Sequence, residues 1–294
     1  MDDDQWLADR FEEHRTHLRA VAYRMLGSLA EADEAVQDAW LRLSRAGAGE
    51  VENLGGWMTT VVARVCLNVL RSRRIRREEP LDAHLPDPVV RPVDAPAPED
   101  EVVLADSVGL ALLIVLDTLT PAERLAFVLH DMFDLPFDDI AALTDRSPAA
   151  ARQLASRARR RVRGADVPAP DPDHGRQRAV VDAFFSAARG GDLEDLVALL
   201  DPDVVLRADG GDRRPAISMV VRGAAVVARQ ATTFSLPRAD LRPALVGGAA
   251  GVVVTVGDRP VAVIGFVVSG GRIVEIDAIA DPGRVRRIAA PVLG

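Results

Sequence analysis

The stretch SPAAARQLASRARRRVR, residues 147–163, decides how the rest of the chain is interpreted. It carries six arginines and no acidic residue, in a chain whose formal net charge is -8. Ser147 suits a helix N-cap and Pro148 suits the first helical position, so we predict that a helix begins here. Apolar residues recur along one side of that helix, which predicts an inward stripe of Ala151, Leu154, Ala155, Ala158 and Val162.

A shorter helix is predicted just upstream, over residues 137–143, with Ile140 and Leu143 facing inward. Residues 144–146 form a tight connection. A helix, a three-residue turn and a basic helix make the pattern of a helix-turn-helix, whose second helix enters the major groove. The outward side chains of the basic helix suit duplex DNA, because arginine forks reach guanine edges and phosphates and glutamine can read adenine. They are Arg152, Gln153, Ser156, Arg157 and Arg160. A solvated basic helix near a domain end is the alternative interpretation.

The composition limits the number of domains, the residues that can fill the cores and the location of the protein. At 294 residues the chain is long enough for two or three domains, and with 48% hydrophobic but only 4% aromatic residues, Ala, Val and Leu must fill the cores. All 36 basic residues are arginine, so the clustering of arginines is more informative than their number. The acidic N-terminus, the single cysteine (Cys66) and the absence of a membrane-length apolar run favour a cytoplasmic protein. His14 and His17 lack a third nearby ligand, so neither a metal site nor a cofactor is predicted.

The first eighty residues predict three helices, over residues 7–25, 31–44 and 54–77. In the second, Ala35, Ala39 and Leu43 face the core. Its other face mixes acidic and apolar groups, which is typical of a protein-docking surface, although an ordinary solvated face fits as well. The third helix is capped by Asn53 and ends in five arginines between residues 71 and 77, a pattern that fits either phosphate binding or solvated charge.

Proline-rich stretches divide the remainder of the chain. We predict an extended, mobile linker over residues 80–98, a helical module over 99–164 with a helix at 99–119 and a capped helix start at Thr120, and a second linker over 165–174. In the C-terminal third, helices precede β-branched runs separated by Gly-rich turns, which predicts an α+β cone with a curved antiparallel sheet.

Four motifs occur in an order that resembles a known family: AYRMLGSLAEADEAVQDAWLRL (22–43), GGWMTTVVARVCLNVLRSRR (55–74), LTPAERLAFVLHDMFDLPFDDIA (119–141) and SPAAARQLASRARRRV (147–162). The chain resembles an extracytoplasmic-function (group 4) bacterial sigma factor, of the subfamily with a fused SnoaL-like (NTF2-like) C-terminal domain. The resemblance implies a multidomain fold: an all-α region 2 bundle (1–79), an all-α region 4 helix-turn-helix (99–164) and an α+β NTF2-like cone (175–294). It also implies an alternative sigma factor that binds core RNA polymerase, directs promoter-specific transcription initiation and is regulated in cis by its C-terminal domain.

The resemblance further implies roles for particular residues. Helix 31–44 would dock on the β′ clamp helices through Asp33, Glu34, Gln37, Trp40 and Leu41. The minus-ten element would be opened and read by the loop 46–54 and the following helix, with Asn53, Trp57, Arg64, Arg71 and Arg74 on the strand, while helix 147–163 would read the minus-thirty-five element. Two departures stand out: His84 replaces the tryptophan of a WLPEP-like motif, of which Leu85-Pro86-Asp87-Pro88 remains, and Asn68 replaces a common acidic residue.

NTF2-like cones enclose an apolar pocket, and some relatives are enzymes with a polar acid or base inside it. The candidates here are Asp209, Arg229 and Asp277; Asp209 lies in a DGGDRR turn and is expected to be exposed, and strand alternation does not settle which way Asp277 faces. A regulatory domain that senses an unknown small molecule is favoured over an enzyme. Two rival hypotheses are a polymerase-independent helix-turn-helix regulator with a ligand-sensing C-terminal domain, and an isomerase or hydrolase tethered to DNA.

Overall fold

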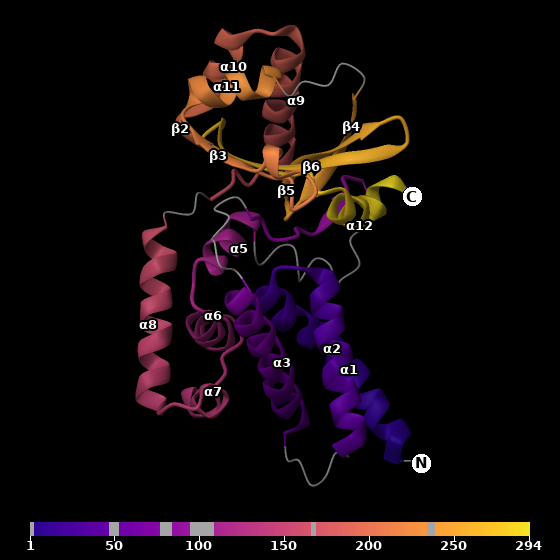
Figure 1. Cartoon of the computed structure of the whole chain (residues 1–294), viewed down its shortest axis with the longest axis vertical. Helices are drawn as coiled ribbons and strands as arrows, with labels where there is room; N and C mark the ends of the chain where they lie inside the picture. The colour runs from indigo at the N-terminus through magenta and orange to yellow at the C-terminus, as the bar shows by residue number, and fades with distance from the viewer. Residues whose placement is uncertain (1–2, 47–52, 77–83, 95–108, 166–168, 234–238) are drawn as a thin grey trace. The chain divides into compact units, whose positions relative to one another are not determined.

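The structure is a computed structural model, and it describes residues 3–46, 53–76, 84–94, 109–165, 169–233 and 239–294 (Figure 1). The chain forms two compact units. One comprises Met1–Pro80 and Leu112–Val167, and the other Leu81–Ala111 and Pro168–Gly294. Among the described residues, no helix is both long enough and apolar enough to cross a membrane.

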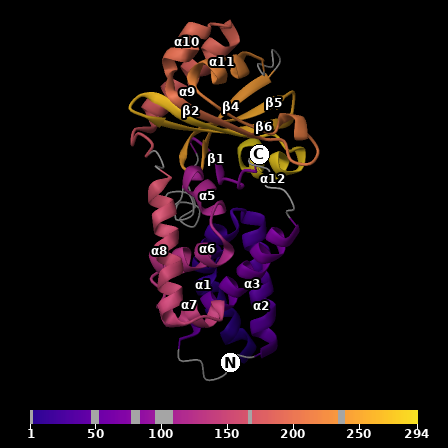
Figure 2. The same cartoon turned by 60° about the vertical axis from the view of Figure 1, so that its left-hand side comes forward.

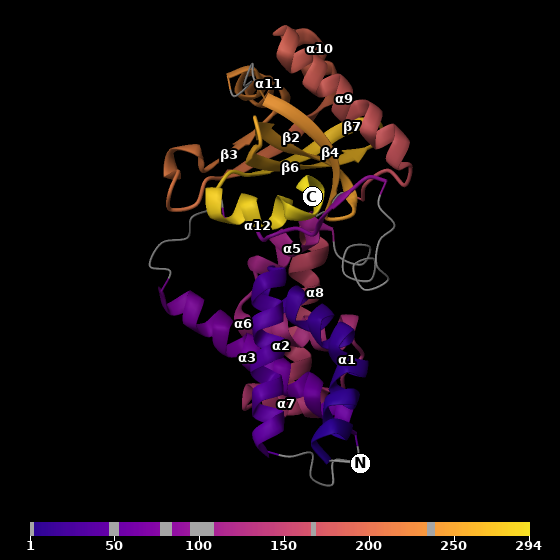
Figure 3. The same ribbon diagram turned by 90° about the vertical axis from the view of Figure 1, so that its right-hand side faces the viewer.

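The first unit begins with a bundle of three helices, α1 (Asp3–Leu26), α2 (Leu29–Ala46) and α3 (Leu54–Arg76), which lie side by side (Figures 1 and 3). Gly27 ends α1 with a positive φ of 73°, a conformation that glycine adopts without a steric penalty. The predicted inward residues of α2, Ala35, Ala39 and Leu43, are buried. All three predicted helices are therefore confirmed, within a few residues at their ends.

The second half of this unit holds the predicted helix-turn-helix. It contains α5 (Leu110–Asp117), α6 (Pro121–Phe127), the π-helical turn η1 (Val128–Met132), α7 (Phe137–Thr144) and α8 (Pro148–Gly164). Thr120 and Glu123 form a reciprocal capping box at the start of α6, as the sequence predicts. Of the helix expected over residues 99–119, α5 is the part that is seen; residues 99–108 lie outside the described residues.

The two helical halves pack against each other within this unit. Arg124 of α6 is only 2% exposed; its Nε donates to the backbone carbonyl of Arg24 at 3.0 Å, and its guanidinium pairs with Asp117. The Arg24 guanidinium in turn lies over the Phe133 ring, 5.0 Å from its centroid, and His17 meets the same ring edge-on at 5.2 Å. The sequence predicts two modules but does not predict this contact between them.

The second unit is an α+β fold with a seven-stranded sheet in the order β1-β4-β5-β6-β7-β2-β3. Its strands are β1 (Val90–Pro92), β2 (Leu200–Asp209), β3 (Met219–Arg222), β4 (Ala239–Val246), β5 (Ala249–Val256), β6 (Arg259–Ser269) and β7 (Arg272–Ile279). The neighbouring strands are antiparallel except β2 and β7, which pair in parallel, so the prediction of an antiparallel sheet is wrong at that one pair.

Helices cover both faces of the sheet (Figure 2). On one side lie α9 (His174–Gly190), α10 (Leu193–Leu199) and α11 (Ala224–Thr233), packed on a core that includes Phe184, Leu196 and Phe266. A short 3-10 turn, η2 (Pro215–Ile217), precedes β3. On the other side lies α12 (Pro282–Leu293), which the sequence analysis does not predict as a helix.

The prediction of a mobile linker over residues 80–98 is wrong for its central part. Residues 85–90 are buried, and β1 adds an edge strand to the sheet by pairing with β4. Residues 80–83 and 95–98 of that prediction lie outside the described residues. The segment His84–Pro92 is named the strap below.

Candidate nucleic-acid and protein interfaces

The helix-turn-helix has the geometry that the sequence predicts. The Ser147 hydroxyl accepts from the Ala150 amide at 3.2 Å and caps α8, and Asp145 makes the turn with a left-handed φ of 54°. Ala151, Leu154, Ala155 and Ala158 are buried and Val162 is half-buried, so the stripe faces the protein. The opposite face is solvent-exposed and consists of the predicted residues, Arg152, Gln153, Ser156, Arg157 and Arg160.

Three arginines of α8 are held by side chains of the preceding helices. The Arg152 guanidinium lies 5.6 Å from the centroid of the Phe137 ring. Arg159 pairs with Asp131 at 2.5 Å. Arg161 pairs with Glu123 at 3.1 Å. Among the six arginines, Arg159 and Arg161 are therefore engaged within the protein, whereas Arg152 is oriented by an aromatic ring and its charge stays exposed.

A second basic surface runs along α3. Trp57, Arg64 and Arg71 are spaced by seven residues, which places them on one face of the helix. Arg64, Arg71 and Arg74 are exposed and Trp57 is half-buried. Asn53 acts as the predicted N-cap, accepting from the Gly56 amide at 2.9 Å.

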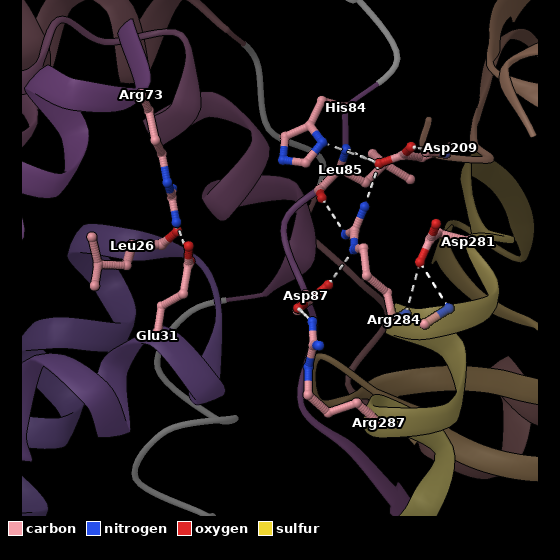
Figure 4. A network of polar contacts seen from close by, with 12 residues as sticks. Leu26, Glu31, Arg73, His84, Leu85, Asp87, Asp209, Asp281, Arg284 and Arg287 are labelled. Carbon is pink, nitrogen blue, oxygen red and sulfur yellow. Dashed lines mark hydrogen bonds and ion pairs between the residues drawn. The ribbon is translucent and has the colours of Figure 1, made fainter. Parts of the chain in front are cut away.

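One arginine of the basic cluster at the end of α3 serves the fold. Arg73 donates to the Leu26 carbonyl at 3.1 Å and pairs with Glu31 (Figure 4). It therefore ties α3 to the junction of α1 and α2. Of the five arginines that the sequence groups together, the side chains of Arg76 and Arg77 lie outside the described residues.

The acidic and apolar face of α2 is exposed to solvent. Asp33, Glu34 and Gln37 are exposed, and Leu41 is 44% exposed, one of the most exposed large apolar side chains that the structure describes. Asp33 is already paired with Arg19, through oxygens at 2.7 and 3.2 Å. Trp40 is half-buried against the Phe11 ring, with the centroids 4.9 Å apart. Among the five predicted residues of this face, Glu34, Gln37 and Leu41 are therefore the exposed ones that no described contact engages.

In the second unit, Arg284 of α12 binds the strap. Its guanidinium pairs with Asp87 at 2.6 Å, donates to the Leu85 carbonyl at 2.5 Å and pairs with Asp209 at 2.5 Å (Figure 4). Arg287 adds a second contact to Asp87 at 3.0 Å.

Asp209 closes the same network from β2. Its carboxylate accepts from the Leu85 amide at 2.9 Å and lies 3.3 Å from His84 Nδ1. Burial alone would raise the pKa of Asp209, but the bonds from His84 and Leu85 and the charge of Arg284 hold it well below its usual value. Asp209 is 3% exposed, so the prediction of an exposed turn residue is wrong. The sequence could not show this, because its partners lie 124 residues before it and 75 residues after it.

Asp277 is buried on the same side of the sheet as Arg207. Arg207 pairs with Asp277 at 3.2 Å and with Glu275 at 3.3 Å. Burial raises the pKa of Asp277 to about 7, against the attraction of Arg207. The same contacts raise the pKa of Arg207, although its own burial acts in the other direction. The pKa values of Asp277 and Arg207 are both raised, because Asp277 is almost fully buried while Arg207 pairs with two carboxylates.

The cone encloses an apolar cavity of about 340 Å³ between the sheet and helices α9 and α11. None of the three predicted pocket residues lines it. Asp209 binds the strap, Asp277 points to the opposite side of the sheet, and Arg229 is exposed on α11. The polar residues that do line it are Arg189, Arg214 and Gln230, which the sequence analysis does not identify.

A helix-turn-helix with an exposed arginine face, packed on a helical bundle with a second basic stripe and an exposed acidic and apolar face, is the arrangement expected of the sigma class of transcription initiation factors. Sigma-70 region 2 matches residues 10–76, and Sigma-70, region 4 matches residues 110–162. The chain is 43% identical to the ECF RNA polymerase sigma factor SigJ of Mycobacterium tuberculosis over 74% of this chain and 70% of that protein. It is 35% identical to the probable ECF RNA polymerase sigma factor SigI of the same species over 96% of this chain and 95% of that one.

The crystal structure of the M. tuberculosis extracytoplasmic function sigma factor SigJ has the same architecture, with a TM-score of 0.70, 34% identity, and coverage of 94% of this chain and 97% of that one. The chain therefore belongs to the ECF RNA polymerase sigma factors, and its C-terminal unit has the α+β architecture that the sequence predicts. It is an alternative sigma factor that directs transcription initiation, and the polymerase-independent regulator is not favoured.

Proposed function

We propose that this sigma factor docks on the β′ clamp helices of core RNA polymerase, in the cytoplasm, through the α2 face. Glu34 and Leu41 support the proposal most directly. Both are exposed, and their combination of charge and apolar surface is the composition expected of a protein interface. Asp33, Gln37 and Trp40 complete the same face, with Asp33 oriented by Arg19.

Promoter contact is assigned to two surfaces. The α3 stripe of Asn53, Trp57, Arg64, Arg71 and Arg74 would hold the minus-ten strand, because arginines neutralise phosphates and an aromatic ring stacks on bases. The exposed face of α8 would read the minus-thirty-five duplex through Arg152, Gln153 and Arg157, with Ser156 and Arg160 beside them.

The packed helical unit is then a resting state. A compact unit of roughly 140 residues is about 40 Å across. The two promoter elements, by their names, are separated by roughly 25 base pairs, or about 85 Å of B-DNA. The α3 and α8 surfaces therefore reach both elements only if the contacts of Arg124 and Phe133 open.

The contacts of the strap support the proposal that the C-terminal domain regulates the sigma factor in cis. The strap belongs to the chain segment that joins α3 to α5, and the C-terminal domain holds it with three charged side chains, Asp209, Arg284 and Arg287, two of which pair with Asp87 of the strap. Fixing part of a connecting segment shortens the effective tether between the two helical modules, which raises the effective concentration of one module around the other. A held strap therefore favours the packed state, and a released strap favours promoter binding.

The experiment is a binding titration with purified core polymerase. Glu34→Arg combined with Leu41→Arg is expected to weaken core binding at least tenfold. The matched control is Leu193→Arg combined with Glu194→Arg on α10, since Leu193 is 45% exposed, almost the same as Leu41. Equal affinities for the two double variants would reject α2 as the docking face.

A further inference from the structure

The cavity of the C-terminal domain is lined almost entirely by apolar side chains, with two arginines and one glutamine among them. Nearly all of its lining is aliphatic or aromatic, from Phe184 on α9 to Leu206, Phe266 and Ile276 on the sheet. No aspartate, glutamate or histidine lines it among the described residues; the polar groups are Arg189, Arg214 and Gln230. At about 340 Å³ it lies in the range of small-molecule sites.

Strand alternation explains why the carboxylates are elsewhere. Leu206 and Ala208 of β2 line the cavity, and so do Ile276 and Ala278 of β7. The residues between them, Arg207 and Asp277, therefore point to the other face of the sheet, where they pair with each other. A side-chain acid or base that could move protons is missing from the lining that the structure describes, which favours binding over turnover.

The two arginines give the cavity a positive edge. Arg189 and Arg214 are both exposed and both line the cavity, so they lie where it meets solvent. Arg189 donates to the Ala239 carbonyl at 3.2 Å, and neither arginine forms an ion pair with a described residue. The domain's partly buried arginines differ: Arg207 and Arg284 each pair with two carboxylates. Two cations without carboxylate partners beside an apolar chamber match a ligand with an apolar body and an anionic end.

We propose that this cavity binds a lipophilic carboxylate, with its chain in the chamber and its carboxylate at the solvent edge that Arg189 and Arg214 line. The inference rests on the proposed regulatory role of the domain and names the class of its ligand. If a water-sized group takes about 30 Å³, the cavity holds roughly eleven such groups. A carboxylate with ten carbons is the corresponding size, so decanoate is a suitable probe.

The test is calorimetric titration of the full chain with decanoate, methyl decanoate and decylammonium. The methyl ester has the same chain without the charge, and the amine reverses the charge. Decanoate should bind with 1:1 stoichiometry and at least tenfold more tightly than the ester, and decylammonium should not compete with it. Equal affinity for the acid and the ester, or no binding of decanoate at millimolar concentration, overturns the proposal.

Variants locate the site. Arg189→Ala combined with Arg214→Ala should remove the tenfold preference for the acid and leave ester binding unchanged. Arg229→Ala is the matched control, an exposed arginine on α11 that does not line the cavity, and it should bind decanoate as the wild type does. Ala231→Phe should fill the chamber and abolish binding of acid and ester, with its fold verified by circular dichroism. Wild-type affinity in Ala231→Phe, or equal losses in Arg229→Ala and the double variant, would place decanoate elsewhere and reject the site.

The same proteins separate this inference from the proposed function. Core binding without ligand should be unchanged in the Arg189→Ala, Arg214→Ala protein, because the α2 face is intact. If the wild type does not use the α2 face but binds decanoate normally, the docking proposal alone is rejected. If it binds core polymerase through the α2 face but does not prefer decanoate over the ester, the ligand class alone is rejected.

Discussion

Replacing Arg284 by alanine should release the strap from the C-terminal domain. The side chain contributes contacts to Asp87, Asp209 and the Leu85 carbonyl, and both carboxylates are less than a tenth exposed. Removing one partner of a buried ion pair costs about 3–5 kcal/mol when the other charge is left alone. Here Arg287 still reaches Asp87, and the Leu85 amide still reaches Asp209, so we expect a smaller loss of about 2–3 kcal/mol.

That loss can be measured as hydrogen exchange. A decrease of about 2–3 kcal/mol in the free energy of local opening corresponds to roughly 30- to 150-fold faster exchange of strap amides, at a tenfold change per 1.4 kcal/mol. Peptides covering residues 84–92 should show this acceleration while those covering β5 and β6 do not. Transcription from a cognate promoter at limiting sigma concentration should increase in parallel.

Arg286→Ala is the matched control for this experiment. Arg286 is exposed on the same helix and, among the described residues, donates only to the Pro282 carbonyl of its own helix, at 3.1 Å. If strap exchange in Arg284→Ala stays within twofold of the wild type, or if Arg286→Ala accelerates it equally, the charged network does not hold the strap and the reasoning is refuted. Unchanged exchange in α12 peptides verifies that the helix itself remains folded.

Three further predictions concern other parts of the molecule. Arg157→Ala should cost about 1–3 kcal/mol on the preferred minus-thirty-five duplex in a DNA-binding titration, and equal losses on every sequence would show that it touches only phosphates. Asp277→Asn should flatten the pH dependence of the free energy of unfolding. The folded-state pKa of Asp277 is raised to about 7, so the wild type loses stability as pH rises from about 4 to 7. Chemical denaturation across that window measures this loss, and the same loss of stability with pH in Asp277→Asn as in the wild type would contradict the prediction. Arg73→Ala should lower the stability of the helical unit by about 1–3 kcal/mol in urea unfolding while the salt dependence of DNA binding stays the same, since Arg73 binds Glu31 rather than phosphate.

The helical part of the fold could be predicted closely because its signals are local. The Ser147 cap, the Thr120 capping box and the buried alanine stripe of α8 each depend on residues within a few positions of one another. The exposed faces follow directly, which is why the predicted arginines of α3 and the predicted outer face of α8 are exposed, while Trp57 is half-buried. Whether they touch DNA stays a prediction.

The parts that could not be predicted depend on distant partners. The sequence predicts a linker at the strap because its prolines disfavour regular structure. Val90–Pro92 forms a strand only because it pairs with β4, more than 150 residues later in the chain. The sequence predicts an exposed turn at Asp209 for the same reason, because no neighbouring residue indicates its contacts with Leu85 and Arg284. The cavity arginines Arg189 and Arg214 come from a helix end and a turn, and no local pattern brings them to one chamber.

The most direct test of the account is the separation of the two promoter-binding modules, measured by single-molecule energy transfer. Dyes on Glu13→Cys in α1 and Gly164→Cys in α8 report it, and the native Cys66 need not be removed because it is buried and burial raises its thiol pKa to about 12. The free protein should show high transfer efficiency, and the complex with core polymerase and promoter DNA should show low efficiency, with Arg284→Ala moving part of the free population to the low state. Unchanged high efficiency in a transcribing complex would contradict the claim that the packed unit opens.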